Sequence, residues 1–198
     1  ISDNTATDLL IDKVGRKRVE RLVRAWGGDA RRNTPFLTTR ELFILKGASY
    51  PKYANRFLSL GTGARRHYLD KVIAKVPLTE VRAWTDPRDL DRLEWFASPV
   101  QVARAYARLA GIADPRVGEI LSINDAGLGL DKARWPVVWH KGGSESGLLA
   151  MSFLARTAGG RTYVVSTTAT DPSKPIPGGV AQELLALTRG AFALVKPS

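Results

Sequence analysis

The sequence predicts an α+β fold, in which a mainly helical region over residues 1–130 is followed by three antiparallel strands and a closing helix over residues 131–198. Two observations predict this order. Between residues 16 and 26, Val19, Leu22, Val23 and Trp26 recur at helical spacing, so one face is apolar and the other basic. Near the C-terminus, three short apolar or β-branched runs at 136–140, 148–154 and 162–168 predict strands, and residues 177–195 predict an amphipathic helix.

Local signals place the helices before the strands. The first is expected over 5–14 and the second over 16–26, ending at Gly27-Gly28. Thr38 and Glu41 have the spacing of a capping box, and Leu37 and Leu42 are placed to form its hydrophobic staple.

A second box, at Ser98 and Gln101 with Pro99 in the first helical position, predicts a helix that runs to about residue 110. Asp114-Pro115 predicts a short helix after it. Between the two boxes, extra helices are expected around 65–76 and 89–95.

Composition excludes several classes of protein. With 198 residues, 44% of them hydrophobic, the chain can bury a core, and no run is long and apolar enough to cross a membrane. The absence of cysteine excludes disulfides, thiol nucleophiles and thiolate metal sites. Two histidines, His67 and His140, make a zinc hydrolase site unfavourable.

The formal net charge of +11 leaves two interpretations open. Basic pairs and triplets at 16–18, 31–32 and 65–66 could supply phosphate contacts in a helical nucleic-acid-binding domain. However, no nucleic-acid-binding motif is present, and the basic residues are spread among several helices. The pattern therefore favours a solvated basic surface and no nucleic-acid partner.

Two motifs lie near opposite ends of the chain. Ser2-Asp3-Asn4 precedes the first helix, and Lys141-Gly142-Gly143 follows a run with strand character. As local patterns, they also fit an ordinary helix N-cap and a glycine-rich hairpin. In this order they resemble the S-D-N and K-T-G signatures of the serine β-lactamase and penicillin-binding-protein superfamily, and of class A β-lactamases in particular.

The resemblance implies a β-lactamase/transpeptidase-like fold, which joins an α/β sandwich to an all-helical subdomain. Residues 1–130 would hold the S-D-N loop, the omega-loop region and an extra helical insertion at about 47–97, and residues 131–198 would hold the strands and the C-terminal helix. The S-x-x-K signature that carries the nucleophile would lie upstream of Ile1. We therefore expect the C-terminal portion of a longer protein, without its first strands and nucleophile helix, whose partner is an N-terminal segment of the same protein.

The implied function is hydrolysis of β-lactams through an acyl-enzyme, without a metal or an organic cofactor, in a secreted or periplasmic protein. The alternatives are a penicillin-binding D,D-peptidase or an esterase of the same fold, and a non-catalytic domain that binds β-lactams or peptidoglycan.

The resemblance also assigns roles at the first motif. Ser2 would relay a proton between the catalytic lysine and the leaving nitrogen, and Asn4 would hydrogen-bond the substrate amide and that lysine. Asp3 would be structural, with its carboxylate buried against backbone donors.

At the second motif, Lys141 would attract the substrate carboxylate, and Gly143 would let the substrate backbone lie close to the strand. The backbone N–H of Ser144 would contribute to the oxyanion hole. Gly142 stands where Thr or Ser is usual, so Ser144 or Ser146 is expected to replace the missing hydroxyl.

In class A β-lactamases, a glutamate in the omega-loop pattern E-x-x-L-N activates the water that frees the acyl-enzyme. This pattern does not occur in the sequence, so the resemblance does not assign that role to one residue. Glu41 is the nearest candidate, although its capping-box position also explains it, and Glu94 is the second. The segment from Ser49 to Lys52 satisfies S-x-x-K, but it follows S-D-N and contains Pro51, so we interpret it as a chance match.

Overall fold

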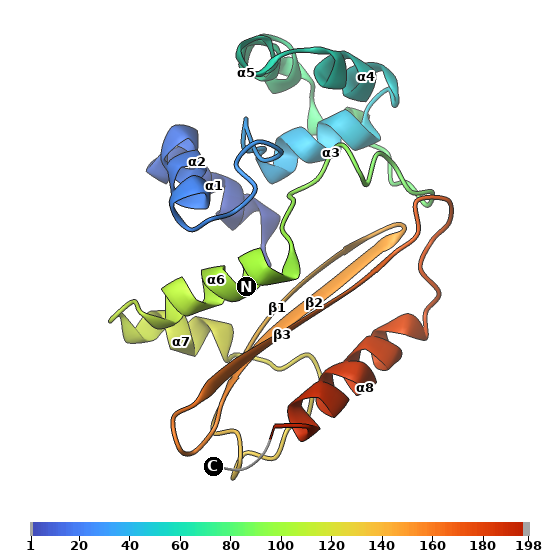
Figure 1. The fold of residues 1–198 in the computed structure, drawn as a ribbon. Helices are drawn as coiled ribbons and strands as arrows, with labels where there is room; N and C mark the ends of the chain where they lie inside the picture. Colours follow the sequence, from blue (N-terminus) through green and yellow to red (C-terminus); the bar gives the residue numbers. More distant parts are fainter. Residues whose placement is uncertain (1, 196–198) are drawn as a thin grey trace. The chain divides into compact units, whose positions relative to one another are not determined.

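A computed structural model describes residues 2–195 of the chain, which divides into two compact units, residues 1–96 and residues 97–198 (Figure 1). Unit 1 contains helices α1 (Asn4–Val14), α2 (Arg16–Ala25), α3 (Thr39–Gly47), α4 (Lys52–Ser59) and α5 (Thr62–Lys71), with short 3-10 helices at Ile73–Lys75 and Leu78–Glu80. Unit 2 contains α6 (Pro99–Ala110), α7 (Pro115–Leu121), β1 (Val137–Glu145), β2 (Leu148–Arg156), β3 (Thr162–Thr170) and α8 (Val180–Ala193). No helix among the described residues is long and apolar enough to span a membrane.

The centre of unit 1 is α3, whose start the sequence predicts. The Thr38 hydroxyl accepts a hydrogen bond from the Glu41 backbone at 3.2 Å, and the Glu41 carboxylate accepts one from the Thr38 backbone at 2.8 Å, so both halves of the capping box form. Leu37 and Leu42 of the expected staple lie in one apolar core with residues of α3, α4 and α5.

The insertion over 47–97 differs in part from the expectation. Helix α4 was not predicted, and the helix expected over 65–76 is divided into α5 and a 3-10 turn. The helix expected over 89–95 is wrong: Asp89 has a φ of 50°, and the segment forms turns. Its side chains bond to distant residues instead, since the Trp95 indole donates to the Leu37 carbonyl at 3.0 Å and Glu94 pairs with Lys46.

The three strands of unit 2 form an antiparallel sheet in the order β1-β2-β3, which confirms the prediction from the sequence. Gly147 lies in the turn between β1 and β2 and has a φ of 80°, a conformation that glycine adopts without steric cost. The register places Lys141 opposite Ser152, and Ser152 opposite Ser166. Residues that face each other in an antiparallel pair share a face, so these three side chains lie on the same side of the sheet.

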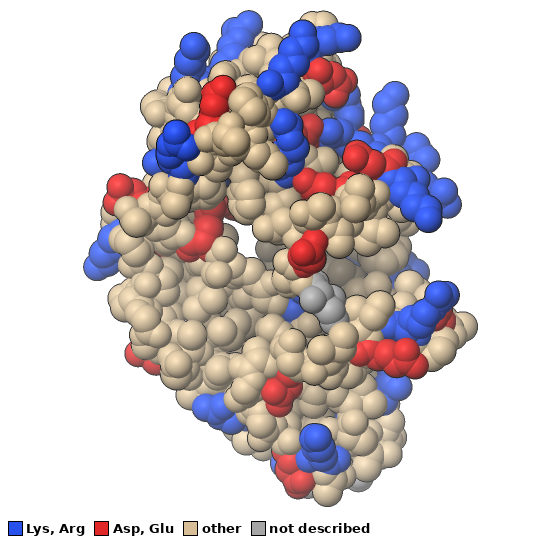
Figure 2. Space-filling view, turned by 180° about the vertical axis from the view of Figure 1, so that it is seen from behind, with Lys and Arg blue, Asp and Glu red and all other residues tan. Residues whose placement is uncertain are grey.

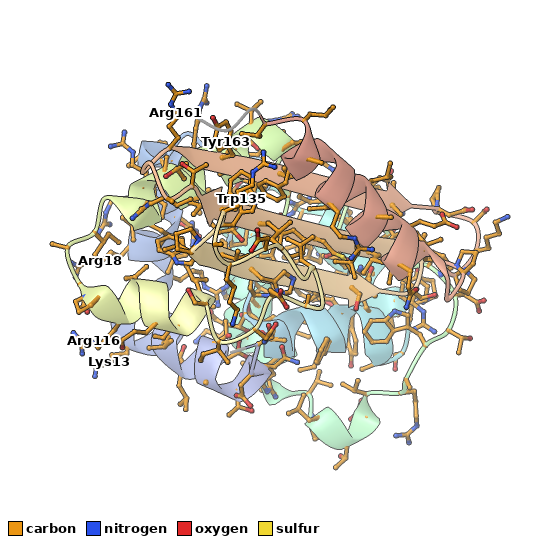
Figure 3. The ribbon with its side chains drawn as sticks, turned by 90° about the horizontal axis from the view of Figure 1, so that it is seen from below. Lys13, Arg18, Arg116, Trp135, Arg161 and Tyr163 are labelled. Atoms are coloured by element: carbon orange, nitrogen blue, oxygen red, sulfur yellow. The ribbon has the colours of Figure 1, made fainter. Side chains whose placement is uncertain are left out.

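Each face of the sheet is covered by helices (Figure 1). On one face, Trp139 and Leu154 pack against Tyr106 of α6. On the other face, Phe153 packs in a cluster with Phe192 of α8 and Trp135. Figure 3 labels Trp135 and Tyr163, whose rings meet edge to face with centroids 5.9 Å apart.

These contacts also explain where the compact units divide. From the sequence, α6 and α7 are expected to belong to the helical region, which would end at residue 130. In the structure both helices pack on the sheet, so unit 2 begins at Ala97. Helical periodicity shows that a segment is a helix, but not which element covers its apolar face.

Candidate active site

The predicted site residues fall in both units. Unit 1 holds Ser2, Asn4 and Glu41, and unit 2 holds Lys141, Gly143, Ser144 and Ser146.

The S-D-N motif forms the N-terminal cap of α1. The Asp3 carboxylate accepts a hydrogen bond from the Ala6 backbone at 2.6 Å, and the Thr7 hydroxyl donates to the Asp3 carbonyl at 2.8 Å. Asp3 therefore has the expected structural role, but its carboxylate is at the surface and not buried as expected. Ser2 and Asn4 flank it and are also exposed.

Glu41 is held by polar contacts on both carboxylate oxygens. Oε1 accepts from Arg16 at 2.6 Å, and Oε2 accepts from Arg16 at 2.8 Å and from the Thr38 backbone. The Arg16 guanidinium also donates to the Phe36 carbonyl at 2.5 Å. Burial lowers the pKa of Arg16, but the hydrogen bond and charge of Glu41 raise that pKa above its usual value overall. The pair thus fixes the start of α2 against the start of α3.

The second carboxylate considered for deacylation is also ion-paired. Glu94 accepts from the ammonium of Lys46, whose side chain is fully buried in unit 1. A charge removed from water in this way depends on its partner, so the contact attaches the segment around Glu94 to α3.

Ser49 and Lys52 do not share a helix. Ser49 is exposed and has a φ of 45°, and α4 begins only at Lys52. An S-x-x-K pair acts when the serine and the lysine lie one helical turn apart. The segment lacks that geometry.

In unit 2, Lys141 lies on β1 at the point where the helical cover ends. Alternation along the strand puts Lys141 on the same face as Trp139, which is buried against α6, but Lys141 itself is exposed. Its ammonium folds back and donates to the Gly142 carbonyl. The partial loss of hydration there lowers the pKa of Lys141.

Tyr106 supports this part of the sheet from α6. Its hydroxyl donates to the Ser152 carbonyl at 2.9 Å, directly across from Lys141. Burial raises the pKa of Tyr106 to about 12, although a hydrogen bond with the Lys141 backbone acts in the opposite direction. The hydroxyls of Ser152 and Ser166 lie 3.1 Å apart and connect β2 to β3. Sequence reasoning missed Tyr106, because the helical spacing marks it only as one more apolar-face residue.

The structure gives a reason for glycine at position 142. A Cβ atom there would lie 3.2 Å from Nε2 of His140 and 3.2 Å from the Ala150 carbonyl. The His140 ring stacks on Phe153 with centroids 4.8 Å apart, and its buried Nε2 has no hydrogen-bond partner among the described residues. Burial lowers the pKa of His140, and the positive charge of Lys141 lowers it further. The negative charge of Asp125 acts in the opposite direction but does not cancel these effects.

The remaining predicted residues lie toward the β1–β2 hairpin. Gly143 is exposed, and no atom lies within 4 Å of the position that its Cβ would take. Ser144 and Ser146 line a hollow of about 240 Å³ between the hairpin and the chain that leads into α8. Its other walls are largely apolar and include Leu149, Ile176 and Ala181. The structure thus brings hydroxyl groups and apolar side chains together at the hairpin end of β1, but on the α8 face of the sheet, whereas the Lys141 side chain lies on the α6 face.

Across residues 2–195, no three side chains of His, Cys, Asp or Glu are grouped so that they could hold a metal ion.

Two solved structures are similar to this chain. The chain is similar to a β-lactamase from Sphaerobacter thermophilus DSM 20745, with 18% identity and a TM-score of 0.52 over 100% of this chain and 61% of that one. A class A β-lactamase from Mycobacterium abscessus is matched with 17% identity and a TM-score of 0.41 over 94% of this chain and 64% of that one. The chain therefore spans less than two thirds of the length of either structure. No curated protein gives a significant match.

The first of these likenesses shows the fold, a β-lactamase fold in which helices accompany an antiparallel sheet. The model of the beta-lactamase enzyme family (Beta-lactamase2) matches residues 1–186, nearly the whole chain. The chain belongs to the beta-lactamase enzyme family.

Proposed function

We propose that this chain is the larger part of a secreted or periplasmic serine hydrolase that opens β-lactams through an acyl-enzyme. The observation that carries the proposal is the position of Lys141, which lies on the edge strand of the sheet and is followed by two glycines. Family membership supports the reaction class.

The chemistry follows from the edge of β1. An edge strand presents backbone donors and acceptors to an extended ligand, and Gly143 leaves the approach free of a side chain. The Lys141 ammonium attracts the carboxylate of the substrate, and the Ser144 backbone N–H is a donor to the oxyanion.

The nucleophile is proposed to lie on a further segment of the protein that carries S-x-x-K, and that segment is the partner of this chain. Ser49 lies in the turn before α4, so Ser49 and Lys52 lack the shared helix of an S-x-x-K signature, and this supports the assignment. Ser2 relays the proton to the leaving nitrogen, and Asn4 binds the substrate amide.

A second candidate is a protein that forms the acyl-enzyme and then holds it, as a β-lactam sensor does. Glu41 and Glu94 are both engaged by cations, and this observation favours slow deacylation. If Glu41 is the base that activates water for deacylation, its carboxylate must first release Arg16 so that a water molecule can bind there.

The test is Lys141→Ala in the protein that includes the S-x-x-K segment. Loss of a charge-assisted contact should lower kcat/KM for a β-lactam by roughly one to three powers of ten. The matched control is Lys132→Ala, which removes an exposed lysine of the same unit and should leave kcat/KM unchanged. Equal losses on the acid and on its methyl ester would contradict the carboxylate-binding role of Lys141.

The time course separates the two candidates. A burst of one equivalent followed by arrest, with an acyl adduct in the mass spectrum, identifies the sensor, whereas continued turnover identifies the hydrolase.

A further inference from the structure

A second hollow lies in unit 1 between α2 and α5. It has a volume of about 450 Å³ and is lined by Arg16, Lys17, Arg18 and Arg21 of α2 and by Arg66 and Asp70 of α5. We call it the α2–α5 hollow. Figure 2 shows many Lys and Arg side chains projecting from the surface of unit 1, and Arg18 is labelled in Figure 3.

Two of its guanidinium groups are held in place by carboxylates. Arg16 is bound bidentately by Glu41, and Arg66 is paired with Glu20. These contacts neutralise much of the charge of the two arginines, but they also fix the walls of the hollow. A ligand would therefore meet a site whose geometry is already ordered.

In the described part of the chain, the charges of the other three cations that line the hollow are not neutralised by a paired carboxylate. Lys17, Arg18 and Arg21 are exposed, and across residues 2–195 no ion pair joins them to a carboxylate. The pairs Lys17–Arg21 and Arg18–Arg21 are four and three residues apart on α2, where like charges repel. The first turn of α2 contains no acidic residue, so its cations also lie at the end of the helix dipole that disfavours them.

We propose that the α2–α5 hollow binds a small molecule that carries a phosphate or diphosphate group. Three uncompensated cations against the single carboxylate of Asp70 fit an anion with more than one charge. Arginine offers a planar fork of donors that matches phosphate oxygens. The volume lies in the range of small-molecule sites and exceeds what a lone phosphate ion would fill.

The probe is pyrophosphate, titrated into the chain at constant ionic strength and followed by calorimetry. Saturable binding with one equivalent is expected. Lys17→Gln and Arg21→Gln should each weaken the affinity by roughly tenfold, the scale of one charge-assisted contact. Arg24→Gln is the matched control, because it removes the same charge from the last turn of α2, outside the hollow, and should leave the affinity unchanged.

A short single-stranded oligonucleotide distinguishes a small phosphorylated ligand from a phosphodiester polymer. Tighter binding of the oligonucleotide than of pyrophosphate, with an equal loss in Arg24→Gln, would show general attraction of a polymer and overturn the proposal. The absence of saturable pyrophosphate binding would overturn it as well. No β-lactam enters this experiment, so its failure leaves the proposed hydrolase function standing.

Discussion

The two units use polar contacts in different ways. In unit 1, Arg16 pairs with Glu41 and Lys46 pairs with Glu94, which lie far away in the chain, although Arg92 also pairs with its near neighbours Asp89 and Asp91. In unit 2, the pairs of Arg116 with Asp114 and of Lys174 with Asp171 are short-range and lie at the surface. The sheet there is held by two apolar layers instead, with Phe153 and Leu154 fully buried on opposite faces.

This difference shows how each unit obtains a defined arrangement. Short helices and long connections leave the parts of unit 1 weakly specified, and a buried charge can be satisfied in only one place. In unit 2 the backbone ladder fixes the register, and a slip by one residue would expose a complete apolar face. Removal of charges should therefore matter more in unit 1 than in unit 2, whereas the sheet of unit 2 should depend on its buried apolar side chains.

The largest effect is expected from Phe153→Ala. Loss of a fully buried phenyl ring should lower the free energy of unfolding by about 3–5 kcal/mol. Urea denaturation measures it, with Leu187→Ala on the exposed side of α8 as the control. A similar decrease in the free energy of unfolding for both variants would contradict the view that the two apolar layers stabilise the sheet.

Gly142→Thr should come next. The new side chain would crowd His140 and the Ala150 carbonyl, at a cost of about 1–3 kcal/mol in the free energy of unfolding. In a His140→Ala background the penalty should become smaller, and a double-mutant cycle measures that coupling. Additive effects would mean that His140 does not explain the glycine at this position.

Glu41→Gln tests the long-range ion pairs of unit 1. Glutamine can still complete the capping box, so the substitution mainly removes the ion pair with Arg16. We expect a loss of about 1–2 kcal/mol in the free energy of unfolding, between the values for exposed and buried pairs.

The matched control for Glu41→Gln is Asp114→Asn, which breaks an exposed short-range pair of unit 2 and should change stability little. Equal effects of the two substitutions in urea denaturation would contradict the contrast between the units.

The smallest effect concerns the protonation of His140, whose pKa is lowered in the folded state. Below the ordinary histidine pKa of about 6.5, the unfolded chain binds the proton more readily than the folded chain. Stability should therefore fall as the pH decreases from about 6.5 through the folded-state pKa of His140, and then become constant with respect to this group.

His140→Phe should remove this part of the pH dependence in urea denaturation, and His67→Gln should retain it. An NMR titration in which the His140 resonance shifts above pH 6.5 would contradict the assignment.

Much of the candidate site could be anticipated from local sequence. Asp3 caps α1, Thr38 begins α3, and Lys141 lies on a strand, because each signal acts within a few residues of the chain. The roles of Ser2, Asn4, Lys141 and Glu41 in catalysis rest on the resemblance and stay predictions.

Local signals along the chain predict most helix starts, the three strands and the motifs that mark the family. Only the tertiary structure showed that Arg16 binds Glu41, that Tyr106 bonds to the strand opposite Lys141, and that the predicted helix at 89–95 is an irregular segment. The reason is physical. Caps and periodicity depend on neighbours in the chain, whereas the partner of a buried charge or hydroxyl is chosen by packing between segments that the sequence leaves far apart.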